Sequence, residues 1–404
     1  MQKRLLFLIA AVMMVSTMIA QVTTSEMSGV VTVGDAKGEP VIGATVQAVH
    51  GPSGTRYATV TNVDGRFNIQ GMRTGGPYSV TVSYIGYQTK VLNGITLQLG
   101  ETYNLAVWIT EDANELSEVL ITAQASKFAA EKTGATTNIS NTQMMSLPTV
   151  DRSISDIARL SPYANGMSFG GGDGRSTNFT IDGANFNNNF GLSANLPGGG
   201  NPISLDAIEE VQVAVAPFDV RQTNFIGGNI NAITKSGTNT FRGTAYTYYR
   251  DQDFRGNRID HKDLGARADE AHKIYGFTLG GPIIKNKLFF FANFEKEIIP
   301  GQVIKYRARE AGEAAGGMVS RTYKSDLQKV SDFLRNTYGY DTGSYTDFPA
   351  DETNTKFLGR IDWNITDRHH LAVRYNNTKN TAWNGPNGNS ADFLSGSHAR
   401  LNGT

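Results

Sequence analysis

The residues with the clearest potential for chemistry lie in a glycine-rich stretch, Gly166-Met167-Ser168-Phe169-Gly170. It matches the Gly-x-Ser-x-Gly pattern in which a hydrolase exposes its nucleophilic serine on a tight strand-to-helix turn. The flanks do not suit that turn, because residues 161–165 make a poor central strand and the glycines that follow cannot begin a stable helix. The stretch therefore indicates a loop, and a hydrolase is the weakest of the functions considered.

Other patterns that suggest phosphate binding or metal binding also fail. The glycine-rich run 170–174 is not followed by Gly-Lys-Ser or Gly-Lys-Thr, as a phosphate-binding loop requires. His50 has no second ligand nearby, and the adjacent His369 and His370 point to opposite faces of a strand. With 0 Cys, thiolate metal sites and cysteine nucleophiles are excluded. We expect no enzyme activity, no metal site and no cofactor.

The composition favours a β-rich protein that does not bind nucleic acid. The 404 residues include 37 Lys or Arg and 37 Asp or Glu, without the basic excess of a nucleic-acid binder. Mean hydropathy is -0.30, and no apolar run of about 18 residues follows the N-terminus, which excludes a helical membrane protein. The 44 Gly, 20 Phe and 16 Tyr indicate many turns and strands.

Residues 1–20 have the pattern of a signal peptide. Lys3 and Arg4 precede an apolar run at 5–15 that is too short to span a bilayer, and Ala20 offers a small-residue cleavage point. The sequence therefore predicts export, with an uncleaved anchor as the alternative.

Residues 28–112 predict a small antiparallel β-sandwich. Short alternating runs are separated by turn residues such as Asp64-Gly65, a strong hairpin signal. The predicted strands are 28–33, 41–50, 56–61, 66–69, 78–84 and 103–109.

Three motifs in this region carry a resemblance to a known family. They are Gly38-Glu39-Pro40-Val41-Ile42-Gly43-Ala44-Thr45-Val46, Thr61-Asn62-Val63-Asp64-Gly65-Arg66-Phe67 and Val82-Ser83-Tyr84-Ile85-Gly86-Tyr87. In this order they resemble the carboxypeptidase regulatory-like domain of Bacteroidota outer-membrane receptors. The resemblance implies no peptidase activity, because the chain has no His-Glu-x-x-His zinc motif.

The segment 115–123 has two interpretations. It is either a linker that ends in a short strand of the next domain, or a segment similar to the TonB box, by which TonB-dependent receptors add a strand to the sheet of the periplasmic TonB protein. The resemblance assigns TonB contact to Leu116, Glu118, Val119, Leu120, Ile121 and Thr122.

Residues 126–235 resemble the plug domain of these receptors, in their Oar-like branch. The matching motifs include Thr177-Asn178-Phe179-Thr180-Ile181-Asp182-Gly183 and Gly227-Gly228-Asn229-Ile230-Asn231-Ala232-Ile233-Thr234-Lys235. Helical spacing at Ile154, Ile157, Ala158 and Leu160, together with strands at 179–182 and 210–215, predicts a mixed α/β unit.

The loop 183–201 between these strands is rich in Gly and Asn and is a candidate ligand-binding surface. Amide groups and aromatic rings suit a polar ligand, although a solvated connector without ligand contact is the alternative. The candidate residues are Asn185, Phe186, Asn187, Asn188, Asn189 and Phe190.

Residues 236–404 show the alternation of an outer-membrane β-barrel, with short turns at 285–287 and 366–368 and a long external loop at 300–353. The residues expected to face lipid are Tyr275, Phe277, Leu279, Phe357, Ile361, Trp363, Ile365, Leu371, Val373 and Tyr375. The family implies a plugged barrel of about 22 strands, whereas this region holds only about five to eight. We therefore expect a C-terminally truncated receptor whose incomplete barrel forms an open sheet.

The predicted fold is mainly β: an N-terminal β-sandwich, a mixed α/β plug domain, and the first strands of an incomplete outer-membrane β-barrel. The resemblance implies a TonB-dependent receptor with its N-terminal domain in the periplasm. Its partners would be the TonB energy-coupling complex, outer-membrane lipid and an extracellular ligand that the sequence does not identify. The alternative is an exported binding or adhesion protein whose β domains do not enter a membrane.

Overall fold

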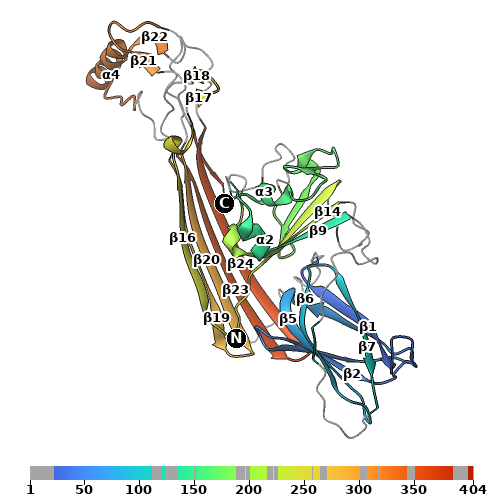
Figure 1. Cartoon of the computed structure of the whole chain (residues 1–404). Helices are drawn as coiled ribbons and strands as arrows, with labels where there is room; N and C mark the ends of the chain where they lie inside the picture. Colours follow the sequence, from blue (N-terminus) through green and yellow to red (C-terminus); the bar gives the residue numbers. More distant parts are fainter. Residues whose placement is uncertain are drawn as a thin grey trace, which may run out of the picture.

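The computed structural model describes most of the chain after the predicted signal peptide. The described residues are 22–111, 120–122, 135–149, 152–187, 196, 201–215, 222, 226–256, 258–263, 271–300, 307–315, 319–343, 351–384 and 399–403. The predicted signal peptide, 1–20, lies outside them. Figure 1 shows a long, tilted sheet, a compact α/β unit against one of its faces, and a β-sandwich at one end.

The β-sandwich consists of two sheets. One has the strand order β4-β1-β7 and the other β3-β2-β5-β6-β8. The strands are β1 (Ser25–Val33), β2 (Thr45–His50), β3 (Thr55–Val60), β4 (Arg66–Met72), β5 (Gly75–Ser83), β6 (Lys90–Leu97), β7 (Thr102–Ile109) and β8 (Leu120–Thr122). The alternation of Tyr78, Val80, Val82 and Tyr84 predicts one packed face, and the first three are buried in β5, whereas Tyr84 lies beyond the strand and is 37% exposed. The hydrophobic core contains only residues of the sandwich itself.

Two sequence predictions for the sandwich were wrong. The sandwich is not wholly antiparallel, because β1 and β7 pair in parallel along their length. Strand β6 was not among the predicted strands, and its Asn93-Gly94 dipeptide is of a kind common in turns. In the structure Gly94 has a φ of 81° and lies at a register shift between β5 and β6, so it forms a bulge rather than a turn.

The α/β unit, called the plug below, is built on a five-stranded sheet with the order β13-β12-β15-β14-β9. Helix α3 is capped by Ser153 and buries Ile154, Ile157 and Ala158, as predicted, but Leu160 is 41% exposed. The elements are β9 (Ala135–Ser140), α2 (Asn141–Ser146), α3 (Ile154–Ala158), β10 (Ala164–Asn165), β11 (Ser168–Phe169), η1 (Gly174–Ser176), β12 (Asn178–Ile181), β13 (Ala184–Asn185), η2 (Leu205–Ala207), β14 (Ile208–Val215) and β15 (Gly228–Thr234).

The Gly-x-Ser-x-Gly pattern folds as a small hairpin within the plug. Ser168 begins β11, which pairs with β10, and Gly166 takes a φ of 61° in the turn between them. No helix follows β11 directly, so the serine is not on a strand-to-helix turn.

The long sheet, called the wall below, has six antiparallel strands in the order β16-β19-β20-β23-β24-β25. They are β16 (Arg242–Arg250), β19 (His272–Ile284), β20 (Leu288–Ile299), β23 (Glu352–Thr366), β24 (His369–Asn384) and β25 (Ala399–Gly403). Every residue expected to face lipid is exposed, from Phe357 at 42% to Tyr375 at 61%. The two outer strands, β16 and β25, do not pair with each other in the described part of the chain, so the sheet is open.

The other face of the wall packs against the plug. Phe291 of β20 and Leu358 of β23 are buried in the same hydrophobic cluster as plug residues such as Phe179 and Val211. The wall and plug therefore share one core.

The connections at the two ends of the wall differ. The predicted short turns follow β19 and β23 at the end beside the sandwich. At the far end lie η3 (Gln252–Phe254), β17 (Arg258–Ile259), β18 (Lys262–Asp263), β21 (Arg307–Arg309), β22 (Val319–Tyr323) and α4 (Lys324–Tyr338) (Figure 1). Among the described residues, no helix has the length and apolar character needed to cross a membrane.

Candidate functional site

The predicted TonB-contact residues are only partly described. Leu116, Glu118 and Val119 lie outside the described residues. Leu120, Ile121 and Thr122 form β8, which pairs in parallel with Val91, Leu92 and Asn93 of β6. The interpretation of this segment as a strand of the next domain was therefore wrong, because β8 joins the sheet of the preceding sandwich.

The candidate ligand loop is described only at its start. Asn188, Asn189 and Phe190 lie outside the described residues. Asn187 accepts a hydrogen bond from the Phe179 backbone N–H at 2.6 Å and donates to Asn178 at 2.8 Å. The Asn185 side chain accepts from the Asn187 backbone N–H at 2.7 Å, and Phe186 packs against the plug core. These contacts tie the start of the loop to β12, and its contact with a ligand remains a prediction.

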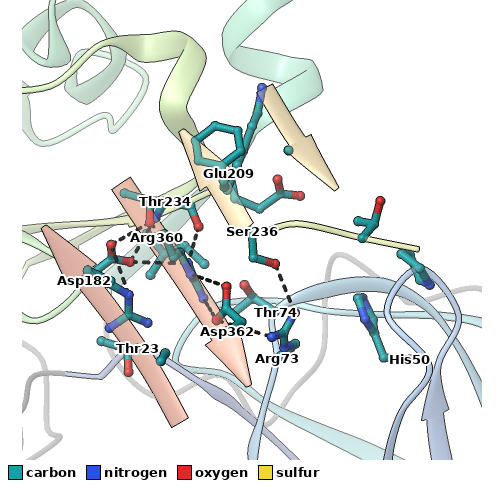
Figure 2. A pocket seen from close by; sticks show the side chains of 18 of the residues that line it. Thr23, His50, Arg73, Thr74, Asp182, Glu209, Thr234, Ser236, Arg360 and Asp362 are labelled. Atoms are coloured by element: carbon teal, nitrogen blue, oxygen red, sulfur yellow. Dashed lines mark hydrogen bonds and ion pairs between the residues drawn. The ribbon is translucent and has the colours of Figure 1, made fainter. Parts of the chain in front are cut away.

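Sequence reasoning did not identify a polar cluster that lies where sandwich, plug and wall meet. Figure 2 shows Arg360 of β23 at its centre. The guanidinium binds Asp362 through two forked hydrogen bonds, Nε at 2.8 Å and Nη2 at 2.9 Å. Its Nη1 donates to the backbone oxygen of Thr234 in the plug at 2.6 Å. A buried charge on the wall thus holds the end of plug strand β15.

Asp182 provides the acidic group of the plug in this cluster. It follows β12 with a φ of 51°, a left-handed conformation that Asp adopts more readily than most residues. Its carboxylate accepts from the Thr234 backbone N–H at 3.0 Å and from the Thr234 hydroxyl at 2.6 Å. Arg374 of β24 lies 3.3 Å away and Arg360 3.9 Å away. Asp182 therefore links two plug strands to each other and to the wall.

Arg73 brings the sandwich into the same cluster. Its Nη2 lies 3.3 Å from Asp362, and its Nη1 donates to the hydroxyl of Ser236 at 3.0 Å (Figure 2). Beside it, Asn364 of the wall donates to Thr55 of the sandwich at 3.0 Å. The sandwich is thus bound to the wall by charge and by hydrogen bonds.

A second contact binds the sandwich to the plug. Leu99, two residues beyond the end of β6, is fully buried. Its N–H donates to Glu210 at 3.1 Å, and its carbonyl accepts from Gln212 at 2.6 Å and from Asn138 at 3.1 Å. The plug therefore satisfies both backbone groups of one sandwich residue.

A cavity of about 630 Å³ opens between the three units, lined by charged residues. Its walls include Arg73, Lys235, Arg242, Arg360 and Arg374, with Asp182, Glu209 and Asp362 as the acidic groups. Burial raises the pKa of Glu209 against the opposing effect of Lys235, and burial lowers the pKa of Lys235. In the part of the chain that the structure describes, no group of three His, Cys, Asp or Glu residues could hold a metal ion.

A further polar contact joins plug and wall nearer the far end. Glu295 of β20 accepts hydrogen bonds from Ser204 of the plug at 2.7 Å and from Tyr246 of β16 at 2.8 Å. Lys356 of β23 pairs with Glu295 at 2.8 Å and with Glu297 at 3.2 Å. The plug is thus held to the wall at two levels.

Two family models match parts of the chain. The carboxypeptidase regulatory-like domain matches residues 27–110, and an outer membrane beta barrel domain matches residues 233–304. Over 238 residues, the chain is 26% identical to the TonB-dependent transporter Oar of Myxococcus xanthus. That match covers 56% of this chain and 21% of the relative, so the chain spans about a fifth of the relative's length.

Two of the solved structures to which the chain is similar are a siderophore receptor and an outer membrane transporter. The siderophore receptor PirA from Acinetobacter baumannii is 20% identical, with a TM-score of 0.40 over 61% of this chain and 31% of that one. The outer membrane transporter YddB from Escherichia coli is 15% identical, with a TM-score of 0.42 over 61% of this chain and 33% of that one. The family matches and the curated relative support a TonB-dependent receptor of the outer membrane.

Proposed function

We propose that this chain is part of a TonB-dependent transporter, in which the wall belongs to a membrane barrel, the plug gates its lumen, and the sandwich lies in the periplasm. The observation that carries the proposal is that the wall has one face of exposed apolar residues and one face that packs against the plug. Phe357 and Ile361 are exposed on one side of β23, while Leu358 on the other side is buried in the plug core. Strands with this alternation suit a barrel wall around a filled lumen.

Transport would require the plug to move relative to the wall. The Arg360 cluster opposes that movement, because separating the plug from the wall would leave the buried carboxylate of Asp182 without Arg360 and Arg374 beside it. Capture of an external ligand would supply part of this free energy, and force from TonB would supply the rest.

Replacing Val119 by Pro in the full-length protein tests coupling to TonB. Proline removes a backbone donor and fixes φ, so it interrupts pairing by strand addition. We expect Val119→Pro to lose binding to the purified periplasmic domain of TonB, and energised uptake with it, while binding of external ligand is unchanged. Ala129→Pro, outside the predicted segment, is the control. Equal TonB binding by both variants would contradict the proposal.

Membrane extraction distinguishes the alternative, an exported binding or adhesion protein. We expect the full-length product to remain in the outer-membrane fraction after washing at high salt. Recovery in the soluble fraction would support the alternative instead.

A further inference from the structure

The predicted TonB-contact segment, 115–123, is called the coupling segment. Its described part, Leu120–Thr122, has a defined partner in the structure. Backbone pairing joins Leu120 to Val91, Ile121 to Leu92 and Thr122 to Asn93. Strand β8 is therefore the outermost strand of the five-stranded sheet of the sandwich. The segment lies on the sandwich through main-chain contacts, the same kind of contact that strand addition to TonB would use.

Strand β6 is suited to receive a strand. Its other edge is paired with β5, and its buried residues Leu92, Ile95 and Leu97 fix it in the core. Without β8, β6 would be the edge of this sheet and would present unpaired N–H and C=O groups. Its edge therefore offers a ready template for one short strand.

The strand that holds β8 is also in contact with the plug. β6 ends at Leu97, and Leu99 follows with both of its backbone groups bound by plug residues Glu210, Gln212 and Asn138. A movement of β14, which carries Glu210 and Gln212, would pull on the end of β6. This gives a continuous contact path from plug to β6 to β8.

We propose that the edge of β6 is a resting site for the coupling segment, and that TonB and β6 compete for Leu120–Thr122. This inference rests on the proposed function. Backbone groups of alternate residues point to opposite edges of a strand, so pairing with β6 occupies one edge of this three-residue strand and leaves TonB only the groups on its other edge. With only three residue pairs, β8 is held weakly enough to be displaced. Movement of the plug after ligand capture would loosen β6 and favour release.

A reversible disulfide tests this competition, because residues 1–404 contain 0 Cys and an engineered pair would supply the only thiols within them. Asn93 and Thr122 are register partners on neighbouring strands. Such partners lie about 5 Å apart, within the Cα separation that a disulfide spans. We expect Asn93→Cys/Thr122→Cys to oxidise spontaneously in the absence of TonB. The oxidised full-length protein should bind the TonB periplasmic domain at least tenfold more weakly than the reduced protein, and reductant should restore binding.

The matched control is Ser79→Cys/Asn93→Cys, which joins β5 to β6 and leaves β8 free. Its oxidised form should bind TonB as the wild type does. If the Asn93→Cys/Thr122→Cys pair does not oxidise without TonB, or if its oxidised form binds TonB undiminished, the inference is overturned while the proposed function stands. If wild-type protein fails to bind TonB, the proposed function fails and the inference with it.

Discussion

Arg73 of the sandwich and Asp362 of the wall form an ion pair of 3.3 Å between two separate units of the fold. The side chain of Asp362 is only 3% exposed and also accepts hydrogen bonds from Nε and Nη2 of Arg360. Arg360 in turn holds the plug through Thr234. The carboxylate of Asp362 therefore contacts both Arg73 of the sandwich and Arg360, which binds the plug.

We expect Arg73→Ala to loosen the sandwich from the wall without releasing the plug, because Asp362 keeps Arg360 as a partner. Loss of a charge-assisted contact costs about 1–3 kcal/mol. Hydrogen exchange at the Asn239 amide reports on this interface, since that amide donates to the Pro52 carbonyl of the sandwich at 2.8 Å. Exchange there should be about tenfold faster. The exposed Arg56→Ala is the control, and equal exchange in both variants would contradict the prediction.

Arg360→Met should destabilise the plug–wall assembly much more strongly. The change leaves Asp182 and Asp362 buried with fewer cations, and breaking a buried ion pair on one side costs about 3–5 kcal/mol. Urea unfolding of the full-length protein in detergent measures the effect. Arg368→Ala, in the exposed turn between β23 and β24, should leave the unfolding midpoint unchanged. A shared midpoint for both variants would exclude a role for Arg360 in holding the plug.

His50 should make the sandwich sensitive to acid. Burial, and secondarily Arg73, lowers the pKa of His50 from 6.5 to about 4. The ring also bonds Ser53 at 2.7 Å. Between these two pKa values the unfolded chain binds a proton that the folded sandwich does not. The contribution of neutral His50 to the free energy of unfolding is therefore complete above pH 6.5 and is lost as the pH falls toward 4.

Unfolding of residues 22–111 by urea at several pH values measures this contribution. The excised sandwich should fold, because its core contains only its own residues. The free energy of unfolding should fall by up to about 1.4 kcal/mol per pH unit within the window. The His50→Gln variant should lack this part of the pH dependence. A ring titration near pH 6.5 in the folded domain would contradict the prediction.

The sequence predicted best those features that depend on local alternation. The face of β23 that carries Phe357, Ile361 and Trp363 follows from a period of two, and the structure exposes all three residues. The buried residues of α3 likewise follow from helical spacing, except that Leu160 is exposed.

Features that depend on contacts between distant segments could not be predicted in the same way. The parallel pairing of β1 with β7 is set by closure of the sandwich around its core. Arg360 and Asp362 alternate along β23 with the residues expected to face lipid, which places them on the inner face of the wall, but their partners Asp182 and Arg73 come from other units. Alternation within one strand does not tell which residues of another unit lie opposite. It therefore marks such charged residues as inward-facing without identifying what they bind.

The exposed face of the wall gives a final prediction, based on depth in the membrane. Ile361 and Ile365 lie on the same face of β23 and are 46% and 47% exposed. Ile365 is next to the end of the strand at Thr366, whereas Ile361 lies five residues inside it, about 12 Å along the membrane normal for a tilted strand. An arginine on the lipid face costs about 2–4 kcal/mol near the midplane and about 0–1 kcal/mol near the interface. Ile361→Arg should therefore reduce outer-membrane assembly of the full-length protein far more than Ile365→Arg, as measured by heat-modifiable gel mobility. A water-exposed sheet would tolerate both changes equally, so equal assembly of the two variants would show that this face does not meet lipid.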